Sequence, residues 1–196
     1  MIKLYCATTN PGKLREFRQI MEHYGGPAFD VEILAELKSI AAPEETGVTF
    51  EENAAIKASY YSQFADAPLF AEDSGLEVDA LENAPGVYYA RDAGEHAIDA
   101  ANNALVRERL KGVENRRARF VCAIALAEKG RVIAAFRGEV EGRIIDEERG
   151  PHGFGYDPMF YFEPFGATFG EVPGERKLLV SHRAKALAAM VEYLRG

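Results

Sequence analysis

Cysteine and tryptophan are scarce in this sequence. Its 196 residues include two cysteines, Cys6 and Cys122, and no tryptophan. There is no Cys-x-x-Cys pair, so the chain offers neither a disulfide framework nor a zinc knuckle. Both cysteines lie in apolar, strand-like runs, where cysteine behaves as a small hydrophobic residue. We therefore expect two buried free thiols in a reducing compartment.

The chain has no excess of positive charge and no long apolar run. The chain carries 23 Lys and Arg against 31 Asp and Glu, a formal net charge of −8 at pH 7. This balance argues against a broad surface for duplex DNA or anionic membranes, which requires a basic face. No apolar run approaches the roughly 20 residues of a membrane-spanning helix, and the N-terminus lacks the apolar segment of a signal peptide. We expect a soluble cytoplasmic protein that binds neither nucleic acid nor membrane.

The composition is that of an ordinary globular protein, with 47% hydrophobic residues and clear periodicity. The patterns predict a single α/β domain over residues 1–196, with strands at 2–7, 30–34, 118–126 and 131–140, and helices at 11–24, 49–64, 99–110 and 181–194. The last two strands form a hairpin that turns at Lys129 and Gly130. Segment 70–81 is predicted to be a strand interrupted by a turn at 73–75. Strand 118–126 is apolar on both faces, which indicates a central place in a sheet covered on both sides.

Acidic residues are concentrated between positions 39 and 90, where ten of them accompany a single base, Lys57. Most of this run is expected to be a solvated face. Glu72 and Asp73 differ because they directly follow the apolar segment 69–71, at the expected end of a buried strand. Two adjacent carboxylates there repel each other unless a cation lies between them.

The expected cation is a divalent metal ion. The chain has no suitable set of cysteine and histidine ligands, and carboxylate oxygens favour Mg²⁺ or Mn²⁺. Glu44 and Glu45, in the loop before the 49–64 helix, could complete the site. The sequence therefore predicts a metal site around Glu72 and Asp73.

The segment from Thr8 to Lys13 joins a strand to a helix N-terminus. Asn10 is the expected N-cap, and Pro11 occupies the first helical position. Free backbone N–H groups, the positive end of the helix dipole and Lys13 would make an anion-binding site. The pattern Gly-x-x-x-x-Gly-Lys-Ser/Thr is absent, and an ordinary capped turn explains this segment equally well.

Two polar residues interrupt the apolar stripe of the 49–64 helix. Asn53 and Lys57 lie four residues apart and therefore share one helix face. Either the lysine extends its stem along apolar surface to reach water, or it reaches phosphates beside the acidic cluster.

Residues 150–158 combine three glycines, two aromatics and one acid. Glycine permits close backbone approach, Phe154 or Tyr156 can stack on a flat ring, and Asp157 can accept a hydrogen bond from a ring N–H. A plain glycine-rich turn is the alternative. Three further candidate polar residues follow toward the C-terminus: Lys177, His182 and Arg183.

Together, these segments resemble the inosine triphosphate pyrophosphatase family, and the match is collinear over nearly the whole chain. The matching blocks stand in the family's order: Ala7–Lys13, Glu44–Gly47, Thr49–Ala54 with Lys57 and Ala58, Glu72–Leu76, Pro85–Tyr88, Gly153–Pro158, Lys177 and Ser181–Arg183. The chain departs from the family pattern at four positions: Thr9, Tyr89, Asp92 and His152.

The resemblance implies an elongated mixed β-sheet with flanking helices, which form two lobes around a nucleotide cleft, and a homodimer. It implies hydrolysis of deaminated purine nucleoside triphosphates (ITP, dITP and XTP) to the monophosphate and pyrophosphate, with Mg²⁺ as cofactor and Mn²⁺ as a possible substitute. Asp73 would be the catalytic base and a metal ligand, assisted at the metal by Glu44 and Glu72. The triphosphate would be held by Thr8, Thr9, Asn10, Pro11, Gly12, Lys13 and Lys57. The nucleoside and its base would be held by Ser74, Phe154, Gly155, Tyr156, Asp157, Lys177, His182 and Arg183.

Two other functions compete with this interpretation. A nucleotide-sensing module without turnover would lack a metal-held base, whereas this chain has three candidate carboxylates. A single-strand RNA-binding domain could stack bases on Phe154 and Tyr156 but would need a basic groove. The only basic-rich stretch, residues 107–119, is interrupted by two glutamates, so the enzyme is favoured.

Overall fold

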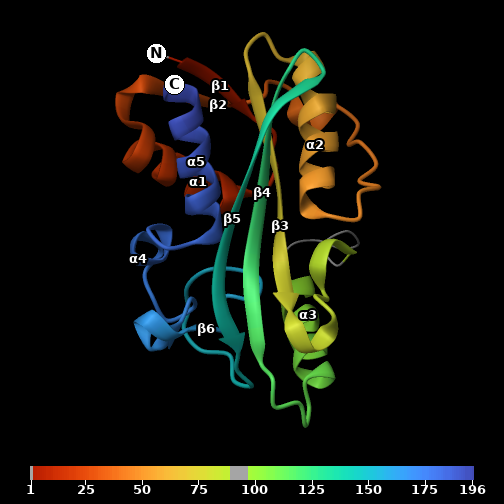
Figure 1. The fold of residues 1–196 in the computed structure, drawn as a ribbon, viewed down its shortest axis with the longest axis vertical. Helices are drawn as coiled ribbons and strands as arrows, with labels where there is room; N and C mark the ends of the chain where they lie inside the picture. The colour runs from red at the N-terminus through yellow and green to blue at the C-terminus, as the bar shows by residue number, and fades with distance from the viewer. Residues whose placement is uncertain (1, 89–96) are drawn as a thin grey trace. The chain divides into compact units, whose positions relative to one another are not determined.

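The computed structural model describes residues 2–88 and 97–196 (Figure 1). The family departures at Tyr89 and Asp92 lie outside the described residues. The principal elements are β1 (Ile2–Cys6), α1 (Pro11–Gly25), β2 (Phe29–Ile33), α2 (Phe50–Tyr61), β3 (Leu69–Val78), α3 (Ala97–Arg109), β4 (Arg117–Glu128), β5 (Arg131–Ile144), β6 (Phe160–Phe162), β7 (Ala167–Thr168), α4 (Gly174–Leu178) and α5 (His182–Arg195). Short 3₁₀ turns connect several of them.

The strands form one mixed sheet in the order β2-β1-β3-β4-β5-β6-β7. β1 pairs in parallel with β2 and β3, whereas β6 pairs antiparallel with β5 and β7. The predicted fold class, α/β with a mixed sheet and flanking helices, is confirmed. None of the helices in the described part of the chain is both long and apolar enough to cross a membrane.

The chain divides into two compact units. The first unit comprises Met1–Ser74, Cys122–Glu139 and Ser181–Gly196, and the second comprises Gly75–Val121 and Val140–Val180. Strands β3, β4 and β5 contribute residues to both. The expectation of a nucleotide cleft between two lobes stays a prediction.

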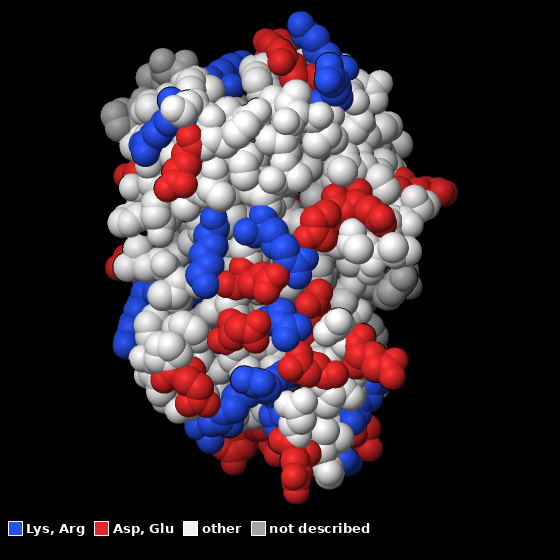
Figure 2. All heavy atoms as spheres, viewed as in Figure 1, with Lys and Arg blue, Asp and Glu red and all other residues white. Residues whose placement is uncertain are grey.

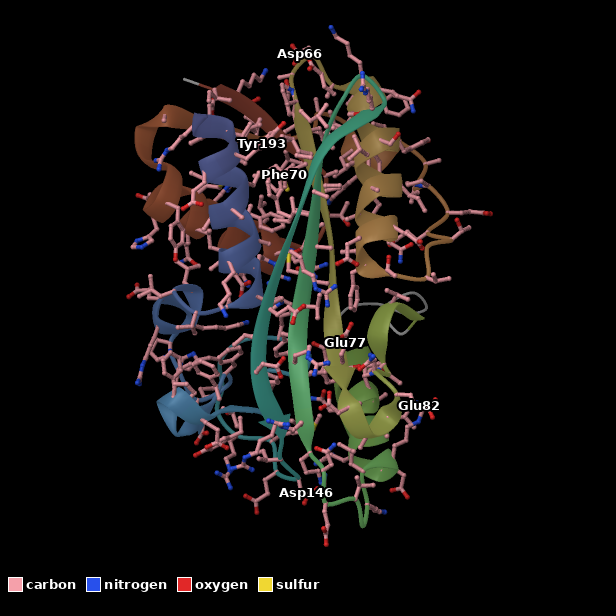
Figure 3. The ribbon with its side chains drawn as sticks, in the orientation of Figure 1. Asp66, Phe70, Glu77, Glu82, Asp146 and Tyr193 are labelled. Carbon is pink, nitrogen blue, oxygen red and sulfur yellow. The ribbon has the colours of Figure 1, made fainter. Side chains whose placement is uncertain are left out.

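In the first unit, helices cover both faces of the sheet. α1 and α5 lie together on one face and α2 lies on the other (Figure 1). Between them, the β4 residues 122–127 are 0–1% exposed, as the apolar run in the sequence predicted. Phe17 of α1 packs edge-on against Phe70 of β3, with ring centroids 5.4 Å apart. Phe70 is labelled in Figure 3.

Local capping fixes where the helices of the first unit begin. The Asn10 side chain accepts hydrogen bonds from the backbone N–H groups of Gly12 and Lys13, at 2.8 and 3.0 Å. Thr49 Oγ1 accepts from the Glu52 N–H at 3.1 Å, and the Glu52 carboxylate accepts in return from the Val48 N–H. The predicted starts of α1 and α2 are confirmed, and α2 tightens into a 3₁₀ turn after Tyr61.

The β4–β5 hairpin turns at Lys129 and Gly130, as predicted. Both residues have positive φ, 50° and 82°, which suits a two-residue hairpin turn. The Ser59 hydroxyl donates to the Gly130 carbonyl at 2.6 Å, and the Gly130 N–H donates to Ser62 Oγ at 3.0 Å. These bonds attach the end of α2 to the hairpin.

The predicted turn at 73–75 is wrong, because β3 runs without interruption from Leu69 to Val78. Asp, Ser and Gly in succession are typical of a turn. In this fold, however, the segment continues β3 beyond its pairing with β1, which ends at Phe70, and the neighbouring strand β4 lies on the other side of β3. Membership of the sheet keeps such a polar run extended. The consequence for the site is large, because alternate residues of a strand face opposite sides of the sheet.

The second unit has its own aromatic core. Phe120, Phe160 and Phe169 pack together with centroid distances of 4.5 to 6.2 Å. Leu76 of β3 and Leu110, just after α3, are completely buried in the same cluster. The sequence patterns did not predict β6, β7 or α4 here, since elements of two to five residues are too short to show periodicity.

Candidate active site

Asp73 projects from β3 toward α2, where two side chains hold it. Lys57 Nζ lies 2.8 Å from Asp73 Oδ1, and the Asn53 amide donates to Asp73 Oδ2 at 3.2 Å. Glu45 reaches the same ammonium group at 3.0 Å. The structure therefore places both polar residues of the α2 stripe against the predicted catalytic carboxylate.

Asn53 also joins this carboxylate to the acidic loop before α2. It is completely buried, and its Oδ1 accepts a hydrogen bond from the Gly47 N–H at 2.9 Å. A Cβ on Gly47 would lie 2.6 Å from that oxygen, so only glycine fits. The helical spacing predicted the face on which Asn53 lies, but Asn53 was not among the predicted site residues.

The electrostatics suit Asp73 as a proton acceptor. Burial raises the pKa of Asp73, and the neighbouring Lys57 opposes this effect only in part. Burial lowers the pKa of Lys57, but Asp73 and Glu45 outweigh it and the pKa of this lysine is raised. The lysine therefore stays charged, while the carboxylate is more basic than an exposed one.

Glu72, the adjacent residue, faces the other helices. Arg183 of α5 donates to both of its carboxylate oxygens, from Nε at 3.0 Å and from Nη2 at 3.2 Å. Lys13 of α1 lies 2.8 Å away, and the Cys122 thiol donates at 3.0 Å. Burial alone would raise the pKa of Glu72, but Arg183 and Lys13 hold it well below its usual range.

The two acids therefore have separate cations rather than one shared cation. The partners of Asp73 come from α2, and those of Glu72 come from α1 and α5 on the opposite face of the sheet. Glu44 is exposed, and its neighbour Glu45 is the residue that reaches Lys57. Among residues 2–88 and 97–196, no three Asp, Glu, His or Cys side chains gather as a metal site.

Arg183 is almost completely enclosed, with its side chain 2% exposed. Besides Glu72, the guanidinium contacts Glu16 of α1 and donates to the Ser74 hydroxyl at 3.1 Å. The base-binding role assigned to Arg183 stays a prediction. Glu16 was missed because a single acid on an amphipathic helix looks like an ordinary surface residue.

At the start of α1, Asn10 occupies two of the N–H groups that the sequence analysis expected to be free. Thr8 accepts a hydrogen bond from the Asn10 N–H at 3.2 Å, and Thr9 is exposed. Lys13 is 22% exposed and paired with Glu72. Any anion bound here would therefore rely on hydroxyl groups and on Lys13 rather than on uncapped backbone.

In the second unit, the side chain of Asp157 accepts hydrogen bonds from within the glycine-rich loop and from Lys177. Asp157 accepts from the Phe154 N–H at 3.0 Å and from Lys177 Nζ at 2.7 Å, and both charged residues are at least 97% buried. Lys177 Nζ also lies 5.1 Å from the centre of the Phe154 ring. Gly153 has φ +78°, and a Cβ there would lie 2.2 Å from the Asp157 carboxylate. The structure thus brings Phe154, Asp157 and Lys177 together.

The basic-rich stretch of the second unit is neutralised by carboxylates. Arg119 lies 2.8 Å from Asp79 and 3.4 Å from Glu77, which is labelled in Figure 3. Arg116 lies 3.0 Å from Asp146. Figure 2 shows basic and acidic side chains interleaved on the face that it draws. This arrangement gives no support to the RNA-binding alternative.

The family model described as Ham1 family matches residues 4–193. The chain belongs to the Ham1 family. Three curated relatives are named dITP/XTP pyrophosphatase. The relative from Exiguobacterium sp. is 44% identical, and the match covers 100% of both chains. Those from Geobacter sulfurreducens and Bacillus subtilis are 46% and 45% identical; each match covers 99% of this chain, and 97% and 98% of the respective relative. The Ham1 protein of Staphylococcus aureus is similar in structure, with a TM-score of 0.85, 38% identity and coverage of 99% and 98%. A HAM1 protein of Coxiella burnetii is also similar in structure, with a TM-score of 0.86 and 37% identity. The match covers 100% of this chain and 99% of the other.

Membership of the Ham1 family confirms the resemblance found in the sequence motifs. It also confirms the prediction of a hydrolase that acts on nucleoside triphosphates. The buried cysteines are confirmed as well, since Cys6 and Cys122 are free thiols with 1% and 0% exposure. The roles of individual residues stay predictions.

Proposed function

We propose that this Ham1-family protein hydrolyses deaminated purine nucleoside triphosphates, namely ITP, dITP and XTP, to the nucleoside monophosphate and pyrophosphate. Relatives named dITP/XTP pyrophosphatase, 44–46% identical over almost the whole chain, support this reaction. The structural observation that carries it is Asp73, a largely buried carboxylate of raised pKa held between Lys57 and Asn53.

Asp73 is the proposed general base. A carboxylate that is oriented by two hydrogen bonds and made more basic by burial can take a proton from an attacking water. Lys57 fixes Asp73 Oδ1 at 2.8 Å and carries a positive charge that would attract the phosphates of a bound substrate. Attack on the α-phosphorus would release pyrophosphate as the leaving group.

The proposed cofactor is Mg²⁺, with Mn²⁺ as a possible substitute; pyrophosphatases of this kind are generally metal-dependent. The residues present fit such an ion, because the carboxylates of Asp73 and Glu45 converge on one ammonium group and offer hard oxygen donors. Glu44, in the loop beside Glu45, remains a candidate ligand. Glu72 would have to act from the other face of the sheet, where Arg183 and Lys13 already neutralise it. When bound, the ion would neutralise charge on the phosphate oxygens.

The two ends of the substrate are assigned to different residue groups. Lys13, Lys57 and the hydroxyl groups of Thr8 and Thr9 are assigned to the triphosphate, at the start of α1 and along α2. The base is assigned to the loop of the second unit, where Phe154 offers a ring face and Lys177 a buried donor. Hypoxanthine and xanthine carry a carbonyl at C6 where adenine carries an amine, so donors in the pocket would favour them.

Ser74 and His182 are further candidates for contact with the nucleoside. Both lie in the first unit, and Ser74 Oγ accepts from Arg183. A homodimer and a cytoplasmic location, in the compartment of the nucleotide pool, complete the proposal.

A nucleotide panel tests the proposed function. Purified protein with Mg²⁺ would be given ITP, dITP, XTP, ATP and GTP, with pyrophosphate and orthophosphate measured separately. We expect pyrophosphate, and not orthophosphate, from ITP, dITP and XTP, and much less turnover of ATP. Tight binding of ITP without release of either product would instead support the nucleotide-sensing module.

A further inference from the structure

Helix α3 has no assigned role in the site, but it contacts the glycine-rich loop of the second unit. Two of its residues, Asp99 and Asn103, lie four positions apart and so share one helix face. Asp99 Oδ2 accepts a hydrogen bond from the Gly155 N–H at 2.8 Å, and Asn103 Nδ2 donates to the Gly155 carbonyl at 3.3 Å. One helix therefore holds both polar groups of a single residue in the glycine-rich loop, more than 50 positions away in the sequence.

Gly155 has a backbone conformation that benefits from such support. Its φ of +60° lies in the left-handed region, and a Cβ built on it meets none of the described atoms within 4 Å. Glycine is needed here for its backbone conformation and not for space. The conformational freedom that permits this φ also makes the peptide easy to displace, unless other groups hold it.

The position of Gly155 sets the position of the proposed ring-stacking residue. Phe154 directly precedes it, and the Phe154 N–H already donates to Asp157. The backbone of Phe154 is thus held by Asp157 on its own N–H and by α3 through the next residue. Rotation of the Gly155 peptide would move the Phe154 ring relative to Lys177, which lies 5.1 Å from its centre.

If Asn103 served only to fill space, it would lower the stability of the protein relative to an apolar side chain of similar size. It is 2% exposed, and in the described part of the chain its Oδ1 has no hydrogen-bond partner. A buried carbonyl without a partner lowers stability, and an apolar side chain of similar size would avoid that loss. The amide is therefore better explained by the bond that it makes to Gly155 than by stability.

We propose that Asp99 and Asn103 are positioning residues that hold the Gly155 peptide and so fix Phe154 beside Lys177, the donor assigned to the purine base. A stacked base would then present its C6 substituent to that donor, which favours a carbonyl over an amine. This role rests on the proposed function, since it concerns discrimination between ITP and ATP. Neither residue is proposed to touch the reacting phosphates.

The test compares Asn103→Leu with Asn102→Leu, a matched change one position away on α3. Successive residues of a helix project about 100° apart, so Asn102 faces a different direction. For both variants, kcat and KM would be measured with ITP and ATP, together with thermal unfolding. We expect Asn103→Leu to lower the ITP-to-ATP ratio of kcat/KM by about tenfold, mainly through KM for ITP, with an unchanged or higher Tm. Asn102→Leu should leave the ratio unchanged.

A second pair of variants covers the possibility that Asn103→Leu does not fold. Asp99→Asn keeps an oxygen that can accept from the Gly155 N–H, whereas Asp99→Ala does not. We expect Asp99→Asn to keep the ratio within about twofold and Asp99→Ala to lower it by about tenfold. A purely structural role would lower turnover of ITP and ATP by the same factor.

The outcomes separate this proposal from the proposed function. Parent protein that released no pyrophosphate from ITP would overturn the proposed function, and this inference with it. Active parent protein, with folded Asn103→Leu or Asp99→Ala variants that kept the parental ratio of ITP to ATP, would overturn the positioning role alone.

Discussion

Replacing Arg183 by methionine should destabilise the protein strongly, because Glu72 would keep its charge in the interior. Both side chains are 2% exposed, and Arg183 donates to both carboxylate oxygens. Removing one partner of such a buried pair costs about 3–5 kcal/mol. Lys13 still lies 2.8 Å from Glu72, so we expect the lower end of that range. In a chain of 196 residues this loss corresponds to a fall in Tm of roughly 6–12 °C.

The measurement is thermal and urea unfolding of Arg183→Met, Glu72→Gln and the double variant at pH 7.5. Removing the buried charge should recover part of the loss, so the double variant should be more stable than the sum of the single changes by about 1–3 kcal/mol. Lys185→Met, two residues along α5 and exposed, is the matched control and should change stability by less than about 1 kcal/mol.

The stability lost in Arg183→Met should depend on pH in a direction set by the pKa of Glu72. Because the folded pKa of Glu72 is depressed, the pair stabilises the protein fully above the ordinary carboxyl pKa, about 4.3. That contribution is lost as the pH falls through the depressed folded value. The difference in stability between parent and Arg183→Met should therefore be largest near neutral pH and shrink in acid. A loss below about 1 kcal/mol at pH 7.5, or additive single changes, would refute the reasoning.

Three further predictions address the chemistry and the packing. Asp73→Asn should lower kcat by roughly 10²-fold or more, while Tm stays within a few degrees of the parent. Steady-state kinetics and thermal unfolding measure the two effects. A kcat within about twofold of the parent value would exclude Asp73 as the base. Protein treated with EDTA should lose ITP hydrolysis and regain it with Mg²⁺, whereas full activity in metal-free buffer would contradict the metal requirement. Gly138→Ala should cost about 3 kcal/mol or more, because the added Cβ would lie 2.1 Å from the His182 carbonyl oxygen where α5 crosses β5. Gly174→Ala, which has open space, is its control and should unfold like the parent.

The kinetics of an Arg183 variant do not by themselves test the predicted contact between Arg183 and the purine base. A variant at this position changes Glu72 and Ser74 as well as any substrate contact. Kinetic loss in Arg183→Ala would therefore combine poorer folding with poorer recognition. The α3 residues of the second unit allow base selection to be measured separately, because Asp99 and Asn103 can be changed without removing a proposed substrate contact.

The sequence by itself determined the local structure and the family. Asn10 caps its helix as predicted, and Thr49 and Ser181 cap the helices that were predicted to begin at 49 and 181, since a capping bond joins residues only two or three positions apart. The apolar run of β4 predicted a central strand, because burial on both faces demands apolar residues at every position. The ordered motifs predicted membership of the Ham1 family.

Only the tertiary structure decided how the acids are used. Composition alone makes 73–75 look like a turn, and membership of the sheet keeps it extended. As a result Glu72 and Asp73 face opposite helices and acquire different cations. Glu72 meets Arg183 across 111 positions of sequence, and Asn103 meets Gly155 across 52. Contacts between such distant segments leave no periodicity or spacing in the sequence, because they exist only once the sheet has brought the segments together.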